Sequence, residues 1–302
     1  MKPLGWSIEM NIIDLYRYRV KKALSLASLF LPSNYPFNKF SFNQGYSYNT
    51  IIGNAIPKSG TYLLESLLRE ISGCNSLSSA SDNRTHILLH SYQTIKPDSI
   101  LFEYPLHATR TFSKLFPGQS CAAHIPYDAR VAQFFEANKN YKHIFMYRDI
   151  RDVLVSYVNF VTNSPNFAQH RATKRQQQVY KSINEDQRFL DAMERMPPHF
   201  FKQFSIWLFD ENTLSISFES LYNELVNLDD SKDDSIVNNI RSFLGVDNSD
   251  ISISKNVLGR GHTSSGNKDK FGQYKDKLSI NIKEEYCRRG YPEVNSLFGY
   301  NS

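Results

Sequence analysis

Two stretches of the chain pass from a short apolar run through a polar turn into a longer apolar pattern. In residues 51–71 (IIGNAIPKSGTYLLESLLREI), an isoleucine-rich run meets Pro-Lys-Ser-Gly-Thr, and leucines then recur at helical spacing. In residues 143–161 (HIFMYRDIRDVLVSYVNFV), an apolar run meets a charged turn and then a mostly apolar segment. Each pattern predicts a strand, a tight turn and a helix, as found in α/β proteins.

The first turn has the composition of an anion-binding loop. A loop between a strand and a helix directs backbone N–H groups and the helix dipole at an anion. Lys58 adds a positive charge, Ser59 and Thr61 add hydroxyl donors, and Gly60 lets the backbone approach a ligand closely. The Walker A pattern is absent from this loop, because the lysine precedes the glycine. We therefore expect a bound phosphate or sulfate here, with a strand-to-helix turn that binds nothing as the alternative.

Residues 57–63 (PKSGTYL) resemble the phosphosulfate-binding loop of the cytosolic-type sulfotransferases, which use 3′-phosphoadenosine 5′-phosphosulfate (PAPS) as sulfuryl donor. In that family, an arginine at a strand end and a serine eight residues later bind the 3′-phosphate of the donor, and Arg148 and Ser156 have this spacing. Arginine forms charge-assisted, often bidentate, hydrogen bonds with phosphate. The alternative for residues 148–152 is a solvated ion-pair cluster of Arg148, Asp149, Arg151 and Asp152, and this is the interpretation favoured for Arg151 and Asp152. The donor-binding residues that the resemblance implies are Lys58, Ser59, Gly60, Thr61, Tyr62, Arg148 and Ser156.

A histidine between the two motifs is the candidate general base. The segment 120–126 (SCAAHIP) contains His124 followed by an apolar residue and proline, and the family carries its base in a comparable place. A histidine has an ordinary pKa near 6.5, so it can accept a proton at neutral pH. Many family members have a lysine where this chain has Ala122. The resemblance therefore leaves Lys58 as the cation that stabilises charge on the bridging oxygen.

The C-terminal third matches the family more weakly. Residues 213–221 (TLSISFESL) resemble a family strand followed by an aromatic-acid-x-hydrophobic turn. Where the family has Arg-Lys-Gly, two residues and Gly-Asp-Trp-Lys, this chain has NKDKFGQYK at 267–275. Lys268, Lys270 or residues 260–261 could supply a further phosphate contact, and the sequence does not choose between them.

The resemblance covers about residues 48–280 and implies an α/β fold with a P-loop-like parallel sheet flanked by helices on both faces, within a single domain over 1–302. Residues 12–31 predict an N-terminal amphipathic helix that packs on the domain, because their apolar run is much shorter than the roughly 20 residues of a membrane span. A position on a membrane surface is the alternative. Residues 162–188 are long and polar, and predict a loop that gates the acceptor site.

Composition agrees with this interpretation. The net charge of +5 suits a donor that carries several negative charges, and no nucleic-acid motif is visible. The three cysteines lack metal-ligand spacing and predict reduced thiols in a cytoplasmic protein. No transmembrane segment and no metal are expected.

The function implied is transfer of a sulfuryl group from PAPS to a hydroxyl or amine of a small-molecule acceptor, for example a specialised metabolite, with release of 3′-phosphoadenosine 5′-phosphate (PAP). A P-loop-type nucleotide kinase is one alternative, but it would normally show Gly-Lys-Ser/Thr and an acidic metal ligand after the second strand, which here ends in Tyr147-Arg148. A non-catalytic module that binds PAPS or sulfate is the other.

Overall fold

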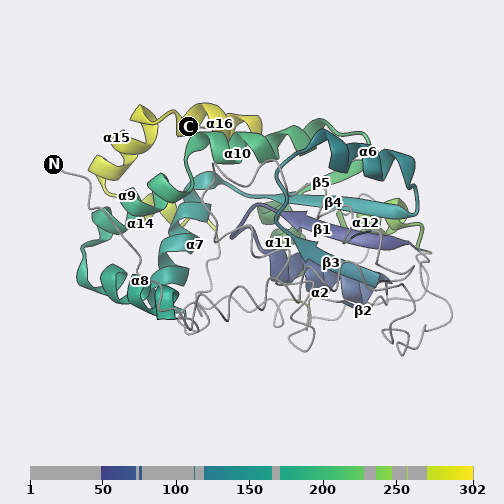
Figure 1. Cartoon of the computed structure of the whole chain (residues 1–302), viewed down its shortest axis with the longest axis horizontal. Helices are drawn as coiled ribbons and strands as arrows, with labels where there is room; N and C mark the ends of the chain where they lie inside the picture. Colours follow the sequence, from purple (N-terminus) through teal and green to yellow (C-terminus); the bar gives the residue numbers. More distant parts are fainter. Residues whose placement is uncertain are drawn as a thin grey trace, which may run out of the picture.

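The fold is built on a parallel sheet in the strand order β2-β3-β1-β4-β5 (Figure 1). The computed structural model describes residues 49–72, 75–76, 112, 119–164, 171–227, 236–246, 257 and 271–301. The strands are β1 (Thr50–Ala55), β2 (Asn75–Ser76), β3 (Gln119–Ala123), β4 (Tyr141–Tyr147) and β5 (Thr213–Ser217). Because all pairings are parallel, the carboxyl ends of the strands lie at one edge of the sheet.

Helices cover both faces of this sheet. One face is covered by α2 (Thr61–Ser72), which follows β1, and by α11 (Phe218–Asn227) and α12 (Ile236–Leu244), which follow β5. The others are α6 (Ala129–Ala137), α7 (Ile150–Asn163), α8 (Arg171–Ser182), α9 (Glu185–Arg195), α10 (Pro198–Ser205), η3 (Ile206–Phe209), α14 (Tyr274–Lys277), α15 (Ile280–Arg288) and α16 (Tyr291–Leu297). The predicted α/β fold, with a parallel sheet between two layers of helices, is confirmed.

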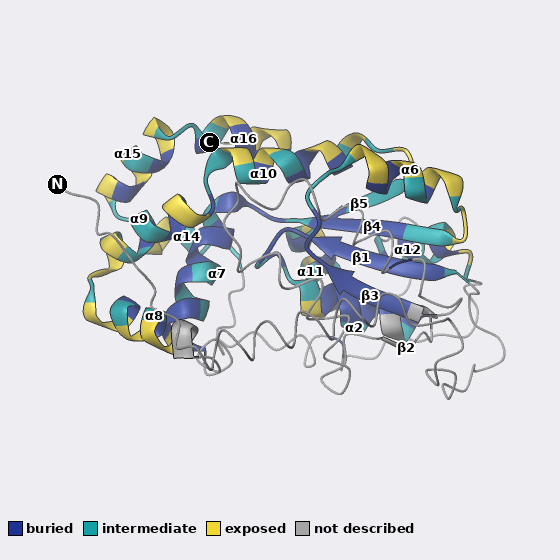
Figure 2. Cartoon of the chain, viewed as in Figure 1, coloured by how far each residue is buried: buried dark blue, intermediate teal, exposed yellow. Residues whose placement is uncertain are grey.

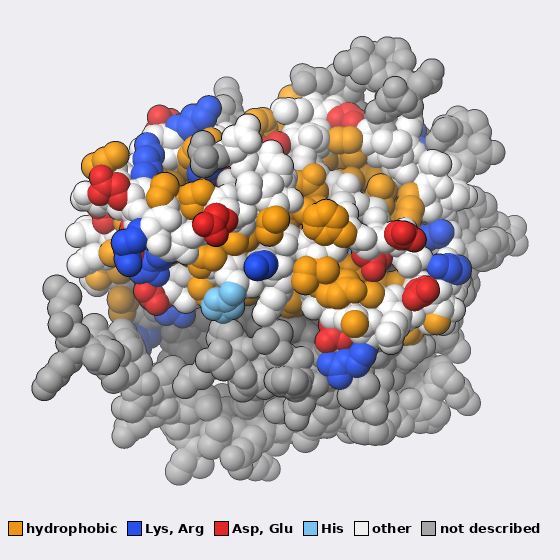
Figure 3. Space-filling view, turned by 90° about the horizontal axis from the view of Figure 1, so that it is seen from above, with side chains coloured by type: hydrophobic (Ala, Val, Ile, Leu, Met, Phe, Trp, Pro, Cys, Tyr) orange, Lys and Arg blue, Asp and Glu red, His pale blue; other side chains and the backbone are white. Residues whose placement is uncertain are grey.

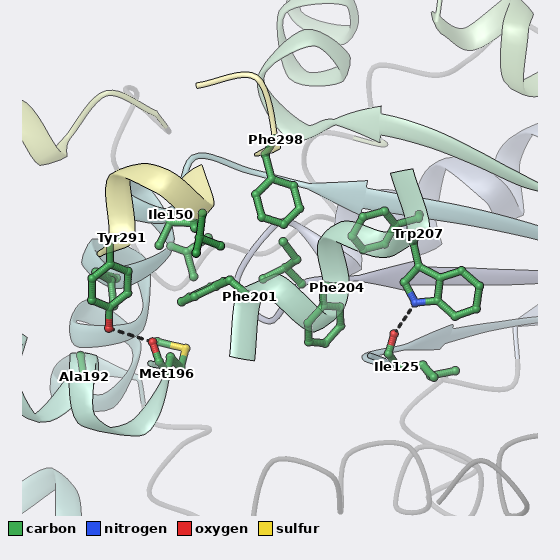
Figure 4. Packing of buried hydrophobic residues seen from close by; sticks show 14 of the residues in the cluster. Ile125, Ile150, Ala192, Met196, Phe201, Phe204, Trp207, Tyr291 and Phe298 are labelled. Carbon is green, nitrogen blue, oxygen red and sulfur yellow. Dashed lines mark hydrogen bonds between the residues drawn. The ribbon is translucent and has the colours of Figure 1, made fainter. Parts of the chain in front are cut away.

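Successive side chains of the central strands point to opposite faces of the sheet, so each face has its own hydrophobic core. In β1, Ile51 packs with the leucines of α2 and with α11 and α12, whereas Ile52 faces a second cluster formed with α6, α7 and α10. Figure 2 shows that the central strands are buried along almost their whole length. Figure 4 shows part of the second cluster, which includes Phe201, Phe204 and Trp207 together with Phe298, the residue that follows α16. The central strands are therefore held firmly, and their ends can position reactive groups.

The prediction of a gating loop over residues 162–188 is wrong for most of that range. The polar stretch forms α8, and α9 begins at Glu185. Gln177 and Tyr180, one turn apart, form a narrow buried stripe on α8, and this stripe was hidden by the polar residues around it. Gln177 fixes the helix by donating to the carbonyl groups of Val161 (3.0 Å) and Ser164 (2.9 Å).

Two further expectations were an N-terminal helix and the absence of a transmembrane segment. The amphipathic helix expected over residues 12–31 lies outside the described residues. Within the described part of the chain, no helix is both long and apolar enough to cross a bilayer.

On the face seen from above, basic and acidic side chains are interspersed among hydrophobic ones, so positive charge does not gather there into one block (Figure 3).

Candidate active site

Four segments that follow strand ends form the candidate site at one edge of the sheet. The loop 56–60 follows β1, His124 follows β3, Arg148 follows β4 and Phe218 follows β5. In open α/β sheets this edge is where ligands bind. Residues that are far apart in the sequence are thus placed together by the parallel pairing of β1 with β3 and β4 and of β4 with β5.

The loop after β1 contains two residues in the left-handed region of backbone conformation. Lys58 has φ 69° and Gly60 has φ 89°. The Ser59 amide donates to the Ile56 carbonyl (3.0 Å), which closes the turn, and the Gly60 carbonyl accepts from the amides of Leu63 (2.8 Å) and Leu64 (3.0 Å). A positive φ is uncommon for a residue with a Cβ and often marks a functional site. Among the described residues, the amides of Thr61 and Tyr62 at the start of α2 have no acceptor, and they therefore suit an anion.

Gly60 is required by its surroundings as well as by its conformation. A Cβ at this position would lie 2.5 Å from Cδ2 and 2.7 Å from Cε2 of Phe218, a ring that is itself buried. Glycine therefore lets the loop lie directly against the first residue of α11.

Alanine at position 60 is expected to destabilise the fold by more than the roughly 1–3 kcal/mol of backbone strain alone, and to weaken binding of PAP. The physical reason is that the added methyl group displaces Phe218, which also supports Arg148. The matched control is Gly245→Ala, because Gly245 has φ 67° but nothing lies within 4 Å of the added Cβ. Chemical denaturation and calorimetric titration of PAP measure both effects. Equal losses of stability in the two variants would contradict the role given to the contact with Phe218.

Arg148 joins the two sequence motifs. Its Nη1 donates to the Lys58 carbonyl at 3.2 Å, and its guanidinium lies 4.5 Å from the centre of the Phe218 ring. Asp152, one turn into α7, is 4.0 Å from Arg148 Nη2. Burial lowers the pKa of Arg148, while Asp152 and Glu219 oppose that shift. The guanidinium is therefore a buried positive charge held beside the anion loop by an aromatic ring and nearby carboxylates.

The Lys58 ammonium lies over α7. Its Nζ is 3.7 Å from the centre of the Phe160 ring, a cation–π contact. Ser156 precedes Phe160 by four residues, so the two side chains share a face of α7. Burial, and then the charge of Arg148, lower the pKa of Lys58 to about 8. Lys58, Arg148 and the face that carries Ser156 are thus neighbours.

His124 is buried immediately beyond the end of β3. Its Nδ1 lies 2.8 Å from the carbonyl oxygen of Ala55, the last residue of β1. Because a carbonyl oxygen only accepts hydrogen bonds, Nδ1 carries the hydrogen and Nε2 carries the lone pair in the neutral ring. The histidine that the sequence singled out therefore lies against the strand that leads into the anion loop.

Arg151 and Asp152 do belong to a cluster of charged residues with Arg148 and Asp149, but the expectation that this cluster is solvated is wrong. Asp152 is 2% exposed and accepts hydrogen bonds from the backbone amides of Gly272 and Tyr274. Arg151 pairs instead with the buried Asp149 (2.6 Å), and its guanidinium lies 4.1 Å from the centre of the Tyr274 ring. These charges are therefore structural, and they fasten residues 271–274 to the start of α7.

The C-terminal segment also supports the Arg148 region. Asn295 is fully buried; its Oδ1 accepts from the Ile150 amide (2.9 Å), and its Nδ2 donates to Asp149 (3.2 Å). The Tyr300 hydroxyl donates to the Glu219 carboxylate, which also accepts from the Asp149 amide (3.2 Å). Burial raises the pKa of Glu219. The strand-to-helix turn at Arg148 is therefore held from two sides.

The predicted residues fall into three groups. Lys58, Ser59, Gly60, Arg148 and His124 meet at this edge, and Ser156 lies on the nearby face of α7. Thr61 is half-buried at the start of α2, whereas Tyr62 is 51% exposed. Lys268 and Lys270 lie outside the described residues.

Phe218, Phe160 and Glu219 were not predicted as site residues. Phe218 and Glu219 form the aromatic-acid pair of the turn after β5, which was a usable signal. For Phe160, four-residue spacing from Ser156 was the only signal, and many apolar residues of α7 share such a spacing with a polar one.

The loop has the properties that an anion requires. The Ser59 hydroxyl is fully buried and has no hydrogen-bond partner among the described residues. The loop itself carries the half-buried Lys58, and the buried Arg148 lies beside it. Within the described ranges, no group of three or more His, Cys, Asp and Glu side chains is arranged to hold a metal ion.

A family model described as "Sulfotransferase domain" matches residues 50–257, which is more than half of the 302-residue chain. The chain belongs to the sulfotransferase family. The matched range contains the loop after β1, His124, Arg148 and Phe218. The comparison with curated proteins found no similar sequence.

Solved structures with partial similarity include a mouse sulfotransferase in complex with PAP, at 14% identity and a TM-score of 0.46, covering 85% of this chain and 90% of that chain. Another is retinol dehydratase in complex with retinol and PAP, at 13% identity and a TM-score of 0.44, covering 86% of this chain and 84% of that chain. Overlap at this level does not align the chains residue by residue, so the family assignment depends on the family model.

Proposed function

We propose that this sulfotransferase transfers the sulfuryl group of PAPS to a hydroxyl or amine of a small-molecule acceptor and releases PAP. The observation that carries the proposal is the hydrogen bond of Arg148 to the Lys58 carbonyl (3.2 Å), which places a buried arginine beside the anion loop. A ligand with two anionic groups could place one on the loop and the other on Arg148. PAP and PAPS have this property, since each bears a 3′-phosphate besides its 5′ group.

In the proposed complex, the loop after β1 and Arg148 bind different groups of the donor. The amides at the start of α2, the Ser59 hydroxyl and the Lys58 ammonium suit the 5′ group. Arg148, with Ser156 on the nearby helix, suits the 3′-phosphate and gives selectivity over ordinary adenine nucleotides. Phe218 contacts both the loop and the arginine, so it keeps the two parts at a fixed separation.

The chemistry follows from the positions of Lys58 and His124. Bound PAPS supplies the sulfuryl group: the bond from sulfur to the oxygen of the 5′-phosphate breaks, and a bond from sulfur to the acceptor forms. His124 Nε2 takes the proton that the acceptor loses. The Lys58 ammonium stabilises the negative charge that develops on the departing oxygen. Sulfuryl transfer, like phosphoryl transfer, depends chiefly on such positioning and charge stabilisation.

A small acceptor is proposed because His124 is 6% exposed and therefore lies within the protein, where a compact hydroxyl or amine can reach it. Specialised metabolites belong to this size class. A cytoplasmic location, predicted from the cysteine pattern, would give access to such compounds.

Calorimetric titration of PAP in the absence of metal, with AMP and ATP as controls, tests the donor site. We expect PAP to bind at micromolar concentration or tighter and both controls to bind much more weakly. Incubation with ³⁵S-labelled PAPS and a panel of phenols, alcohols and amines then tests transfer. Equal binding of all three nucleotides, or a Mg²⁺-dependent preference for ATP, would contradict the proposal. Binding of PAP without labelled product from any acceptor would favour a non-catalytic module.

The affinity for PAP is expected to be constant at low pH and to fall about tenfold by pH 9. Lys58 has a pKa lowered to about 8, so its ammonium is fully charged well below that pH and mostly neutral above it. Phosphate in the complex keeps the ammonium charged, and the apparent dissociation constant therefore rises as the charged fraction of the free protein falls. Titrations of PAP from pH 6.5 to 9.5 measure this profile. Lys58→Arg should remove the dependence, because a guanidinium stays charged over this range; identical profiles for the two proteins would exclude Lys58 as its source.

A further inference from the structure

The side chain of Asn54 continues the pairing of β1 with β3 beyond the last pair of strand residues. The backbone register ends at Asn54 and Ala123. Past this point, Asn54 Oδ1 accepts from the Ile125 amide (2.7 Å), and Asn54 Nδ2 donates to the Ile125 carbonyl (2.9 Å). Asn54 is fully buried. One amide side chain therefore satisfies both polar groups of a single backbone residue.

The residue held in this way directly follows His124. The Ile125 carbonyl also accepts from Trp207 Nε1 at 2.8 Å, a contact drawn in Figure 4. On the other side, His124 Nδ1 bonds to the carbonyl of Ala55, the neighbour of Asn54 in β1 (2.8 Å). Consecutive residues of β1 thus hold the backbone after His124 and the ring of His124 itself.

Only an amide suits this position among side chains of similar size. Asparagine presents one donor and one acceptor at the end of a short stem, whereas an ionised aspartate only accepts and a serine reaches less far. A buried amide without partners would be costly, so the two bonds to Ile125 also explain why a polar residue is tolerated in a central strand. Hydrophobic residues fill the neighbouring positions Ile52 and Ile56 in the same strand and loop.

We propose that Asn54 is a positioning residue for His124: by fixing the Ile125 backbone, it holds the imidazole against the Ala55 carbonyl and so keeps Nε2 as the proton-accepting atom. The proposal rests on the proposed function, in which His124 is the general base. Without the amide, the Ile125 backbone would lose its two bonds to β1 and keep the bond that its carbonyl accepts from Trp207. The ring would then sample other orientations and both neutral tautomers.

Asn54→Ala is expected to lower kcat about 10- to 100-fold, since small displacements of a catalytic group have effects of this size. The dissociation constant of PAP should change less than about twofold, because the two side-chain bonds of Asn54 go to Ile125 rather than to the loop or Arg148. Turnover is measured with ³⁵S-labelled PAPS and the same acceptor panel. The matched control is Ser120→Ala, which alters a buried side chain of β3 whose hydroxyl has no partner among the described residues.

The tautomer of His124 tests the proposal directly, because it should not change in Asn54→Ala if Asn54 only stabilises the fold. Two-bond ¹H–¹⁵N spectra of the imidazole, assigned by their loss in His124→Ala and recorded well above the pKa of a free histidine, show which nitrogen carries the hydrogen. We expect the Nδ1–H form in the wild-type protein and in Ser120→Ala, and a mixture of both forms in Asn54→Ala. An unchanged tautomer would overturn the proposal even if kcat fell, and so would a changed tautomer with wild-type kcat.

Asn54→Asp provides a second variant in case the alanine variant does not fold. Burial raises the pKa of a carboxyl group, and its neutral form can donate to and accept from Ile125 as the amide does. The ratio of its kcat to that of the wild-type protein should therefore be near one at pH 6 and fall as the pH rises; a ratio that does not depend on pH would contradict the proposal. If the wild-type protein transfers no label, the proposed function fails, while the tautomer measurement still decides the role of Asn54.

Discussion

Alanine in place of His124 is expected to lower kcat by about 10²- to 10⁴-fold, the range found when general acid–base catalysis is lost. The acceptor must lose a proton as the new bond to sulfur forms, and the buried His124 is the residue proposed to accept it. The dissociation constant of PAP should be almost unchanged, because the phosphate groups are proposed to bind the loop after β1 and Arg148 rather than His124. Initial rates with saturating PAPS and calorimetry with PAP measure the two quantities.

His199→Ala is the matched control for this variant. His199 is an exposed histidine at the start of α10, so its removal should leave kcat and the affinity for PAP at wild-type values. A His124→Ala protein that turns over at nearly the wild-type rate would exclude His124 from the role of base. Parallel loss of PAP affinity would indicate instead that the change disturbs the end of β3 as a whole.

Arg148→Ala is expected to weaken PAP binding about 10- to 150-fold, which corresponds to the roughly 1.5–3 kcal/mol of a hydrogen bond to a charged group. Affinity for AMP should change much less, since AMP lacks the 3′-phosphate. The ratio of the two dissociation constants, measured by calorimetry, is therefore the critical quantity. It separates loss of a phosphate contact from general damage to the site.

Two arginine variants serve as controls. Arg148→Lys keeps the charge but not the planar fork, so it should recover part of the affinity for PAP. Arg151→Gln removes a nearby arginine that pairs with Asp149 rather than facing the loop, and should leave the ratio of PAP to AMP affinity unchanged. Arg148→Ala removes a positive charge that stabilises the ionised forms of Asp152 and Glu219, so its melting temperature should fall. The titrations should therefore be done well below that temperature. Equal weakening of PAP and AMP would contradict the assignment of the 3′-phosphate to Arg148.

The sequence predicted best those parts of the candidate site whose residues lie within one continuous stretch of the chain. A strand, a glycine-containing turn and a helix are all encoded within residues 51–71, so the sequence alone was enough to place Lys58, Ser59 and Gly60 in one loop. The spacing after β4 identified Arg148 in the same way. Contacts that depend on pairing between distant segments were not predictable. The bond from Arg148 to the Lys58 carbonyl spans 90 residues, and the ring of Phe218 reaches both only because β5 lies beside β4.

The errors have a related cause. Polar composition was interpreted as a loop in residues 162–188, although a helix at a surface needs only a narrow apolar stripe. The charges at 151–152 were interpreted as solvated, because nothing in their local sequence indicates that Gly272, Tyr274 and Asn295 would cover this turn. In both cases the local sequence was compatible with several environments, and partners far along the chain decided between them.

The C-terminal contacts bear on where this domain ends as a folding unit. The family match stops at residue 257, yet the amides of Gly272 and Tyr274 satisfy the buried Asp152, and Asn295 completes the start of α7. Removing the residues after 270 would therefore expose the carboxylates of Asp149 and Asp152 and remove their hydrogen-bond donors. We therefore expect cooperative unfolding to extend beyond the range of the family match, with the final helices melting together with the candidate site.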